Sequence, residues 1–226
     1  MPRISRGFGA DQIYHIINRG NNRTQVFHKP EDYAAFIHLF GQAAELFPMK
    51  IFSYCLMPNH FHLLAASVYA GELSRFMQWL MTSHVRRYHS HYGGAGHIWQ
   101  GRFKSFIVKA DSHLLTVARY VEGNSVRACL VEKAIEWPWS SHAETVGLRE
   151  RVFTCPLPVD LPANWSKYVD TPLSEAELKK MQRSVLRQAP YGDDAWCEGV
   201  CRKYHLESTL RPRGRPRKNK VACPLL

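Results

Sequence analysis

The sequence predicts an α+β fold of the ferredoxin-like type, a βαββαβ chain that forms one antiparallel four-stranded sheet with helices on one face. Short runs rich in Ile, Phe, Tyr and Leu are typical of strands, and two longer stretches with apolar residues at helical spacing are typical of amphipathic helices. They follow one another as strand, helix, strand, strand, helix, strand. In this plan the first and third strands are neighbours at the centre of the sheet.

Local signals place the individual elements. Pro30 followed by two acidic residues is typical of a helix start, and Gly93-Gly94 of a helix end. The turn Met57-Pro58-Asn59 joins two strands, and Asp111 or Ser112 is expected to cap a helix after the sheet. The expected elements are a strand at 12–18, a helix at 31–47, strands at 50–57 and 60–67, a helix at 71–91, a strand at 97–108 and a helix at 111–123.

The chain beyond residue 142 is expected to be an extension of this domain. Prolines make residues 143–175 look irregular, whereas Ser174 with Glu177 forms a capping-box pattern that predicts a helix reaching about Gln188. A second helix is expected near 193–207. The predicted organisation is a domain over 1–142, a proline-rich linker over 143–173, a small helical extension over 174–210 and a basic tail over 211–226.

The composition is that of a basic globular protein. Its 226 residues are 45% hydrophobic, which suffices for a core, and no apolar run approaches the ~18 residues that span a membrane. The N-terminus lacks the apolar segment of a signal peptide, and the six cysteines, which form no CxxC pair, are expected to be reduced. These features predict a cytoplasmic protein with no membrane partner. A net charge of +11 favours a polyanionic partner.

His60 and His62 are the most informative residues. They are i and i+2 on an expected strand, so both imidazoles point to the same face and Phe61 points to the other. Two adjacent imidazoles on one sheet face suit a metal site, although half-buried strand histidines are the commoner explanation of such a pair taken by itself. His15, on the neighbouring first strand, is expected close to the pair, where packing or a hydrogen bond is its more common role.

Tyr120 and Asn124 lie four residues apart at the end of the helix expected over 111–123, so they share one face. A tyrosine hydroxyl can attack a phosphodiester when a cation orients and polarises the phosphate. An asparagine carbonyl oxygen can be a third ligand beside two histidines. Since a lone tyrosine usually packs a helix onto a sheet, the helix indicates a nuclease site only in combination with the histidine pair.

Several segments, in this order along the chain, resemble a known family, the REP-associated tyrosine transposases. These are relatives of the single-tyrosine insertion-sequence transposases in the wider HUH nuclease group. The resemblance covers most of residues 11–142 and parts of 180–217. The matching segments are 14–20 (YHIINRG), 54–64 (YCLMPNHFHLL), 99–106 (WQGRFKSF), 120–128 (YVEGNSVRA) and 137–141 (WPWSS), followed by 191–193 and 206–211 in the extension.

The resemblance implies that residues 1–142 form an HUH transposase domain, a metal-dependent single-stranded DNA endonuclease and strand transferase. Its nucleophile falls on Tyr120, which forms a 5′-phosphotyrosine, and its metal ligands fall on His60, His62 and Asn124. The family implies Mg²⁺ or Mn²⁺, whereas two imidazoles by themselves favour zinc or manganese. The implied substrate is single-stranded DNA at the foot of a repetitive palindromic (REP) hairpin in a bacterial nucleoid, handled by a monomer or a homodimer.

Two positions depart from the family pattern. Ser125 stands where many relatives have proline, and a serine there is expected to cap the helix that follows. Gln188-Ala189-Pro190 stands where relatives often have Gly-Arg-Pro. The first departure touches local geometry and not the proposed chemistry, and the second is expected to weaken a contact in the extension.

Basic residues on the expected strands suit nucleic acid. Arg19 and Asn21 lie at the mouth of a loop, and Arg102 and Lys104 alternate on a strand beside two phenylalanines, a mixture that suits single-stranded DNA. The tail is typical of a disordered basic segment that binds any phosphate backbone. The alternative is an AT-hook that places Arg213 and Arg215 in a narrow minor groove.

Two other functions fit parts of the pattern. A ferredoxin-like module could bind RNA or single-stranded DNA without cleaving it, and then Tyr120→Phe leaves its function intact. A zinc-dependent hydrolase could use His60 and His62 with water as nucleophile, and then cleavage occurs without a covalent protein–DNA adduct.

Overall fold

In the computed structural model, residues 9–211 are described. Four strands form one antiparallel sheet in the order β2-β3-β1-β4. β1 and β3 are the central pair, with Arg19 opposite His60, so the predicted ferredoxin-like order is confirmed. The strands are β1 (Ile13–Arg19), β2 (Met49–Met57), β3 (His60–Ser67) and β4 (Lys104–Val108).

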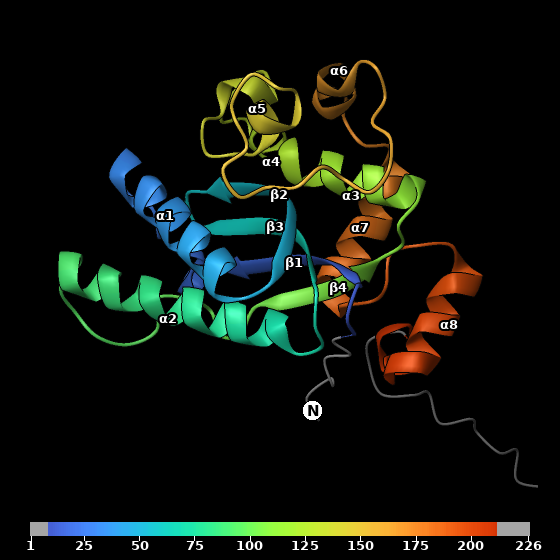
Figure 1. Cartoon of the computed structure of the whole chain (residues 1–226), viewed down its shortest axis with the longest axis horizontal. Coiled ribbons are helices and arrows are strands. Elements are labelled where there is room, and N and C mark those ends of the chain that lie inside the picture. The colour runs from blue at the N-terminus through green and yellow to red at the C-terminus, as the bar shows by residue number, and fades with distance from the viewer. Residues whose placement is uncertain (1–8, 212–226) are drawn as a thin grey trace, which may run out of the picture.

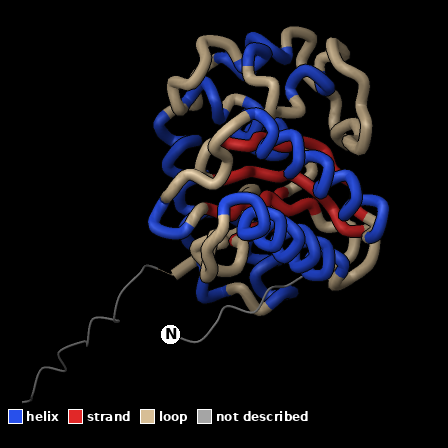
Figure 2. The backbone as a smooth tube through the Cα atoms, turned by 90° about the vertical axis from the view of Figure 1, so that its left-hand side faces the viewer, coloured by secondary structure: helices blue, strands red, loops and turns tan. Residues whose placement is uncertain are grey.

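Helices cover both faces of the sheet (Figures 1 and 2). The predicted pair, α1 (Pro30–Leu46) and α2 (Glu72–Tyr92), lies on one face. The helix that follows the sheet, α3 (Ser112–Glu122), packs on the opposite face, where it contacts β2 and β3. β3 can be buried on both sides because five of its eight residues are apolar and they point to both faces. Phe61, Leu63 and Ala65 join the core under α1 and α2, and Leu64 and Ala66 join the core under α3.

The strand expected over 97–108 is shorter than predicted, and Arg102 lies outside it. Ile17 pairs with Lys104, and Gly20, just after β1, pairs with Trp99. Two residues lie between Ile17 and Gly20, whereas four lie between Trp99 and Lys104 in the opposing segment. The two extra residues between Trp99 and Lys104 cannot pair with β1, so this stretch is irregular. Within it Gly101 adopts a φ of +131°, a region that favours glycine. The expectation that Arg102 and Lys104 alternate on one strand is therefore wrong.

Later parts of the chain form backbone hydrogen bonds with both edges of the sheet, as segments that protect sheet edges do. On the β2 side, Leu56 N donates to Trp139 O, and Ser141 N donates to Tyr54 O. On the β4 side, Lys109 N donates to Tyr191 O, and Tyr191 N donates to Ile107 O.

The segment over 143–173, expected to be irregular, contains the short helix α6 (Trp165–Asp170), whose Trp165 is buried against α3. The capping box predicted at Ser174 and Glu177 is present and opens α7 (Glu175–Arg187). The helix α8 (Asp194–Tyr204) follows, and a short 3-10 helix, η3 (Glu207–Thr209), comes after it. Arg213 and Arg215, and with them the expected basic tail from residue 212 on, lie outside the described residues.

None of the helices within 9–211 combines the length and the apolar character needed to cross a bilayer. The five cysteines in the described part of the chain are free thiols.

The buried His84 on α2 predicts a pH-dependent stability. Its Nδ1 accepts a hydrogen bond from Trp99 Nε1 at 3.3 Å, and burial lowers its pKa to about 4. In the unfolded chain His84 binds a proton near pH 6.5, whereas in the folded chain it stays neutral until the pH approaches 4. The free energy of unfolding therefore falls as the pH drops from 7 toward 4. His84→Asn keeps an acceptor but cannot titrate. Urea unfolding at pH 7 and 5 should show that His84→Asn loses about 1–2 kcal/mol less than the wild type over this interval. Equal losses in both proteins would contradict this assignment.

Candidate active site

Three histidines meet on the face of the sheet that α3 covers. His62 Nδ1 lies 2.8 Å from His15 Nε2, in a hydrogen bond between neighbouring strands, and His60 Nδ1 lies 2.7 Å from Asn59 Oδ1. The rings of His60 and His62 are 5.0 Å apart. His15 is held by stacking on Phe106 at 4.7 Å. The structure thus brings His15 to the pair, as the strand order predicts.

These histidines are neutral at physiological pH. Burial, aided by the charge of Arg127, lowers the pKa of His15 to about 3. Burial and the charges of Arg19 and Arg127 lower the pKa of His60 to about 3, and the pKa of His62 lies well below its ordinary value, chiefly through burial. A neutral imidazole has a lone pair to offer. Both His60 and His62 form their hydrogen bond through Nδ1. Within residues 9–211, Nε2 of each ring has no hydrogen-bond partner.

Tyr120 lies beside the histidines. Its ring is 5.4 Å from the His62 ring and 6.0 Å from the His15 ring, both edge-on. The guanidinium of Arg127 lies over the Tyr120 ring, 3.9 Å from its centroid. Both terminal nitrogens of Arg127 also donate to the Tyr120 carbonyl at 3.3 Å. The tyrosine is therefore held through its ring and through its backbone.

Asn124 begins a separate short helix, α4 (Asn124–Arg127), because α3 ends at Glu122 and the chain breaks its helical run at Gly123. A Cβ at Gly123 would lie 2.9 Å from Val169 O, so glycine allows α6 to approach this junction. Ser125 does not cap the helix as expected. The break comes earlier, Gly123 is the N-cap, and the buried Ser125 hydroxyl has no partner among the described residues.

The side chain of Asn124 is buried and faces Arg127, which donates to its Oδ1 at 2.8 Å. Its Nδ2 is buried without a hydrogen-bond partner in the described part of the chain. The amide must be oriented this way, because a flipped amide would point its N–H groups at a guanidinium. The carbonyl oxygen has a second lone pair that Arg127 does not use.

The donor set fits a divalent cation with few protein ligands. No three His, Cys, Asp or Glu side chains within 9–211 are grouped to hold a metal ion. Two imidazole Nε2 atoms and one amide oxygen remain, which suits a cation that takes its other ligands from water or phosphate. The hydrogen bonds at the two Nδ1 atoms orient the rings, as the outer partners of metal-bound histidines do.

The residues expected to bind DNA are only partly brought together. Arg19, Arg102 and Lys104 line one pocket of about 300 Å³, which Val185 and Leu186 of α7 close on one side. Asn21 is exposed in a neighbouring turn and does not line this pocket. Phe103 and Phe106, expected to offer base-stacking surfaces beside these residues, are buried because the sheet is covered on both faces.

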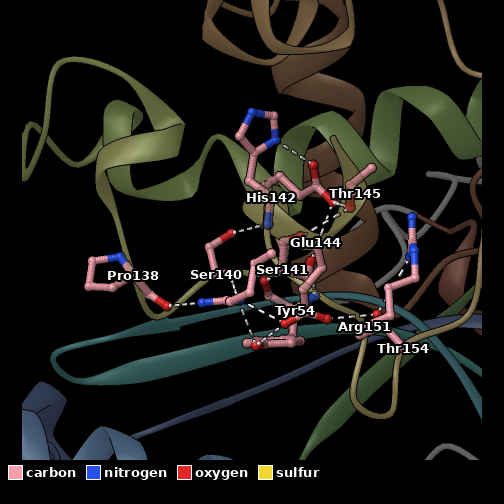
Figure 3. Close-up of polar contacts among 11 residues, drawn as sticks. Tyr54, Pro138, Ser140, Ser141, His142, Glu144, Thr145, Arg151 and Thr154 are labelled. Carbon is pink, nitrogen blue, oxygen red and sulfur yellow. Dashed lines mark hydrogen bonds and ion pairs between the residues drawn. The ribbon is translucent and has the colours of Figure 1, made fainter. Parts of the chain in front are cut away.

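A buried polar network anchors the end of α3 (Figure 3). The carboxylate of Glu122, fully buried two residues after Tyr120, accepts from Thr145 Oγ1 at 2.6 Å, from Trp165 Nε1 at 2.8 Å and from Ser141 Oγ at 3.3 Å. His142 Nδ1 lies 2.8 Å from the same carboxylate.

Next to it, the buried Glu144 carboxylate accepts from Tyr54 on β2 at 2.9 Å, from Arg149 at 2.8 Å and from Thr154 at 2.7 Å. The two carboxylates tie the segment after residue 137 to the sheet and to the tyrosine helix.

Sequence reasoning missed two features of this site. Arg127 was part of the matched segment 120–128, and its spacing of three from Asn124 and seven from Tyr120 places it on the same side of a helix, a signal that could have been used. Glu122 had no comparable signal. Its partners lie between residues 141 and 165, and only the tertiary structure brings them to it.

The fold agrees with comparisons to known proteins. The profile of the family described as "Transposase IS200 like" matches residues 10–124, which include both histidines, Tyr120 and Asn124. The chain belongs to this family of transposases.

Within it, the chain is similar to REP-associated tyrosine transposases, as the sequence predicted. It is 26% identical over 153 residues to a Haemophilus influenzae protein named "Putative REP-associated tyrosine transposase", a match that covers 62% of this chain and 85% of the relative. A solved REP-associated tyrosine transposase, bound to a REP hairpin, superimposes with a TM-score of 0.55. That match covers 72% of this chain and 96% of the other at 19% identity.

Removal of the Glu122 charge should destabilise the protein. In Glu122→Gln one side-chain oxygen is replaced by a donor that faces other donors, at a cost of about 3 kcal/mol. The matched control is Glu175→Gln, whose side chain is exposed and pairs only with Lys179, and which should change stability by less than about 0.5 kcal/mol. Urea unfolding measures both. Equal, small effects would show that the network does not hold the end of α3.

Proposed function

We propose that this chain is a metal-dependent single-stranded DNA endonuclease and strand transferase with Tyr120 as its nucleophile. The observation that carries the proposal is the position of the Tyr120 ring, 5.4 Å from the ring of His62, in a site with two unengaged imidazole nitrogens. His60, His62 and Asn124 would hold Mg²⁺ or Mn²⁺. When bound, such a cation polarises a non-bridging oxygen of the scissile phosphate.

The proposed reaction is a transesterification at Tyr120. The Tyr120 oxygen attacks phosphorus in line with the leaving 3′ oxygen. As the O–P bond forms, the phenol loses its proton, the bond from phosphorus to the 3′ oxygen breaks, and that oxygen takes up a proton. The products are a 5′-phosphotyrosine and a free 3′-hydroxyl. Attack by a 3′-hydroxyl on the phosphotyrosine reverses the step and rejoins strands without nucleotide energy, because the new ester replaces the old one.

Tyr120 is proposed to attack a phosphate that is bound at the cation site of its own chain. Tyr120 is already next to His62 of the same chain, and Arg127, from the same segment, fixes it there. Both sheet edges are covered by the chain's own segments over 139–141 and 191. A monomer therefore contains a complete set of the proposed groups.

The proposed substrate is single-stranded DNA next to a REP hairpin, because a solved relative of the same fold is bound to one. The basic pocket supports a path for the strand. Arg19 lies opposite His60 in the sheet, so the pocket formed with Arg102 and Lys104 opens beside the histidine pair. A second pocket of about 600 Å³ shares Asn18 and Arg102 with the first and adds apolar side chains such as Met81, Val85 and Ile98 to its lining. A single strand presents phosphates and unstacked bases together, so a basic pocket next to apolar side chains suits it.

The test of this function is a covalent-adduct assay. The protein is incubated with 5′- and 3′-labelled oligonucleotides carrying REP hairpins, with and without Mn²⁺, and resolved on a denaturing gel. The wild type should form a metal-dependent adduct that keeps the DNA 3′ of the cut. Tyr120→Phe should reduce it at least about 10³-fold, and His60→Ala about 10²-fold. Cleavage without an adduct would favour the zinc hydrolase, and tight binding without cleavage would favour the binding module.

The basic pocket makes a separate prediction about binding. Each lysine or arginine that contacts a phosphate of single-stranded DNA adds about 0.7 to the slope of log K against log salt. Arg102→Ala with Lys104→Ala should therefore lower the slope by about 1.4 in a fluorescence-anisotropy titration with Tyr120→Phe protein. Arg75→Ala, which removes an exposed arginine of α2 paired with Glu72, is the control and should leave the slope unchanged. An unchanged slope in the double variant would place the strand elsewhere.

A further inference from the structure

Arg127 touches both groups that flank the proposed cation. One of its terminal nitrogens is 2.8 Å from Asn124 Oδ1, the oxygen assigned as third ligand. Its guanidinium also lies 3.9 Å from the centre of the Tyr120 ring and bonds the Tyr120 carbonyl. A cation held by Asn124 and the guanidinium of Arg127 would therefore share one oxygen atom, with two like charges within a few ångströms.

Within residues 9–211 the guanidinium of Arg127 bonds the Tyr120 carbonyl and Asn124 Oδ1 and forms no ion pair with a carboxylate. The three proposed ligands, two imidazoles and an amide, include no acidic side chain. Arg19 adds a second positive charge next to His60. Because hard divalent cations prefer negatively charged oxygen ligands, the site without DNA binds them poorly. The scissile phosphate is the group that would bring the missing negative charge.

We propose that Arg127 makes tight binding of the divalent cation conditional on a bound phosphodiester, while it holds Tyr120 and Asn124 in position for the attack. Arg127 is thus a positioning residue whose charge couples the binding of cation and DNA. The inference rests on the proposed function, because it assumes a cation at His60, His62 and Asn124. Binding linkage is reciprocal, so the cation must strengthen DNA binding by the same factor.

The experiment measures Mn²⁺ affinity directly, by electron paramagnetic resonance of free Mn²⁺, in Tyr120→Phe protein that cannot cut DNA. Titrations are run without DNA and with a hairpin oligonucleotide, and binding of Mn²⁺ to the oligonucleotide by itself is subtracted. The DNA should tighten Mn²⁺ binding about 5- to 150-fold. An oligonucleotide with an uncharged methylphosphonate at the cleavage position, mapped in the adduct assay, should give no such gain.

Variants of Arg127 separate its charge from its shape. Arg127→Gln removes the charge and should bind Mn²⁺ at least about 5-fold more tightly than its parent without DNA, with a smaller gain when DNA is added. Arg127→Lys keeps the charge but loses the planar stacking, so the gain should remain while adduct formation by a chain with intact Tyr120 falls. Arg75→Gln, an exposed arginine on α2, should match its parent. Circular dichroism and thermal unfolding confirm that each variant is folded.

Two outcomes overturn the inference. In the first, Mn²⁺ binds equally well with and without DNA, or fails to bind in either case. In the second, Arg127→Gln binds Mn²⁺ no more tightly than its parent without DNA. If the wild type still forms the Tyr120 adduct, the proposed function stands and only the role of Arg127 fails. If no adduct forms and Mn²⁺ does not bind, both fail.

Discussion

The hydrogen bond between His15 and His62 joins the two central strands of a sheet that is buried on both faces. It engages Nδ1 of His62 and so leaves Nε2 without a partner within residues 9–211, in a ring that lies beside those of Tyr120 and His60. Because the surroundings are apolar, burial keeps these imidazoles neutral and able to donate lone pairs. The same burial makes any added charge costly, so the electrostatics of the site depend on the few charged groups that reach it.

Segments from the second half of the chain hold the helix that carries Tyr120. Arg119, the residue before it, is buried, pairs with Glu177 on α7 at 2.7 Å and lies over Tyr168 on α6 at 4.3 Å. Glu122, two residues after it, is bound by four donors from the segment over 141–165. The extension therefore contributes to the rigidity of the site, since α3 has partners on both sides of the tyrosine.

The two charged side chains that act on the histidine pair, Arg127 and Arg19, are both positive. Arg127 and Arg19 face neutral histidines, and Arg102 and Lys104 continue the positive surface into the adjoining pocket. This local arrangement agrees with the net charge of +11 for the whole chain. A polyanion would relieve the repulsion among these groups, and the proposed role of Arg127 would make DNA binding and cation binding parts of one equilibrium.

Periodicity along the sequence predicted the order of strands and helices along the chain and the shared face of His60 and His62. The single helix predicted to carry Tyr120 and Asn124 on one face is divided at Gly123. Such patterns are local, because side chains alternate along any strand and recur along any helix. Tertiary structure alone decided the rest. It placed Arg102 off its strand, Phe106 under His15, and Glu122 among donors more than 18 residues further along the chain. These contacts depend on which surfaces meet when the sheet is covered, and no spacing within one segment contains that information.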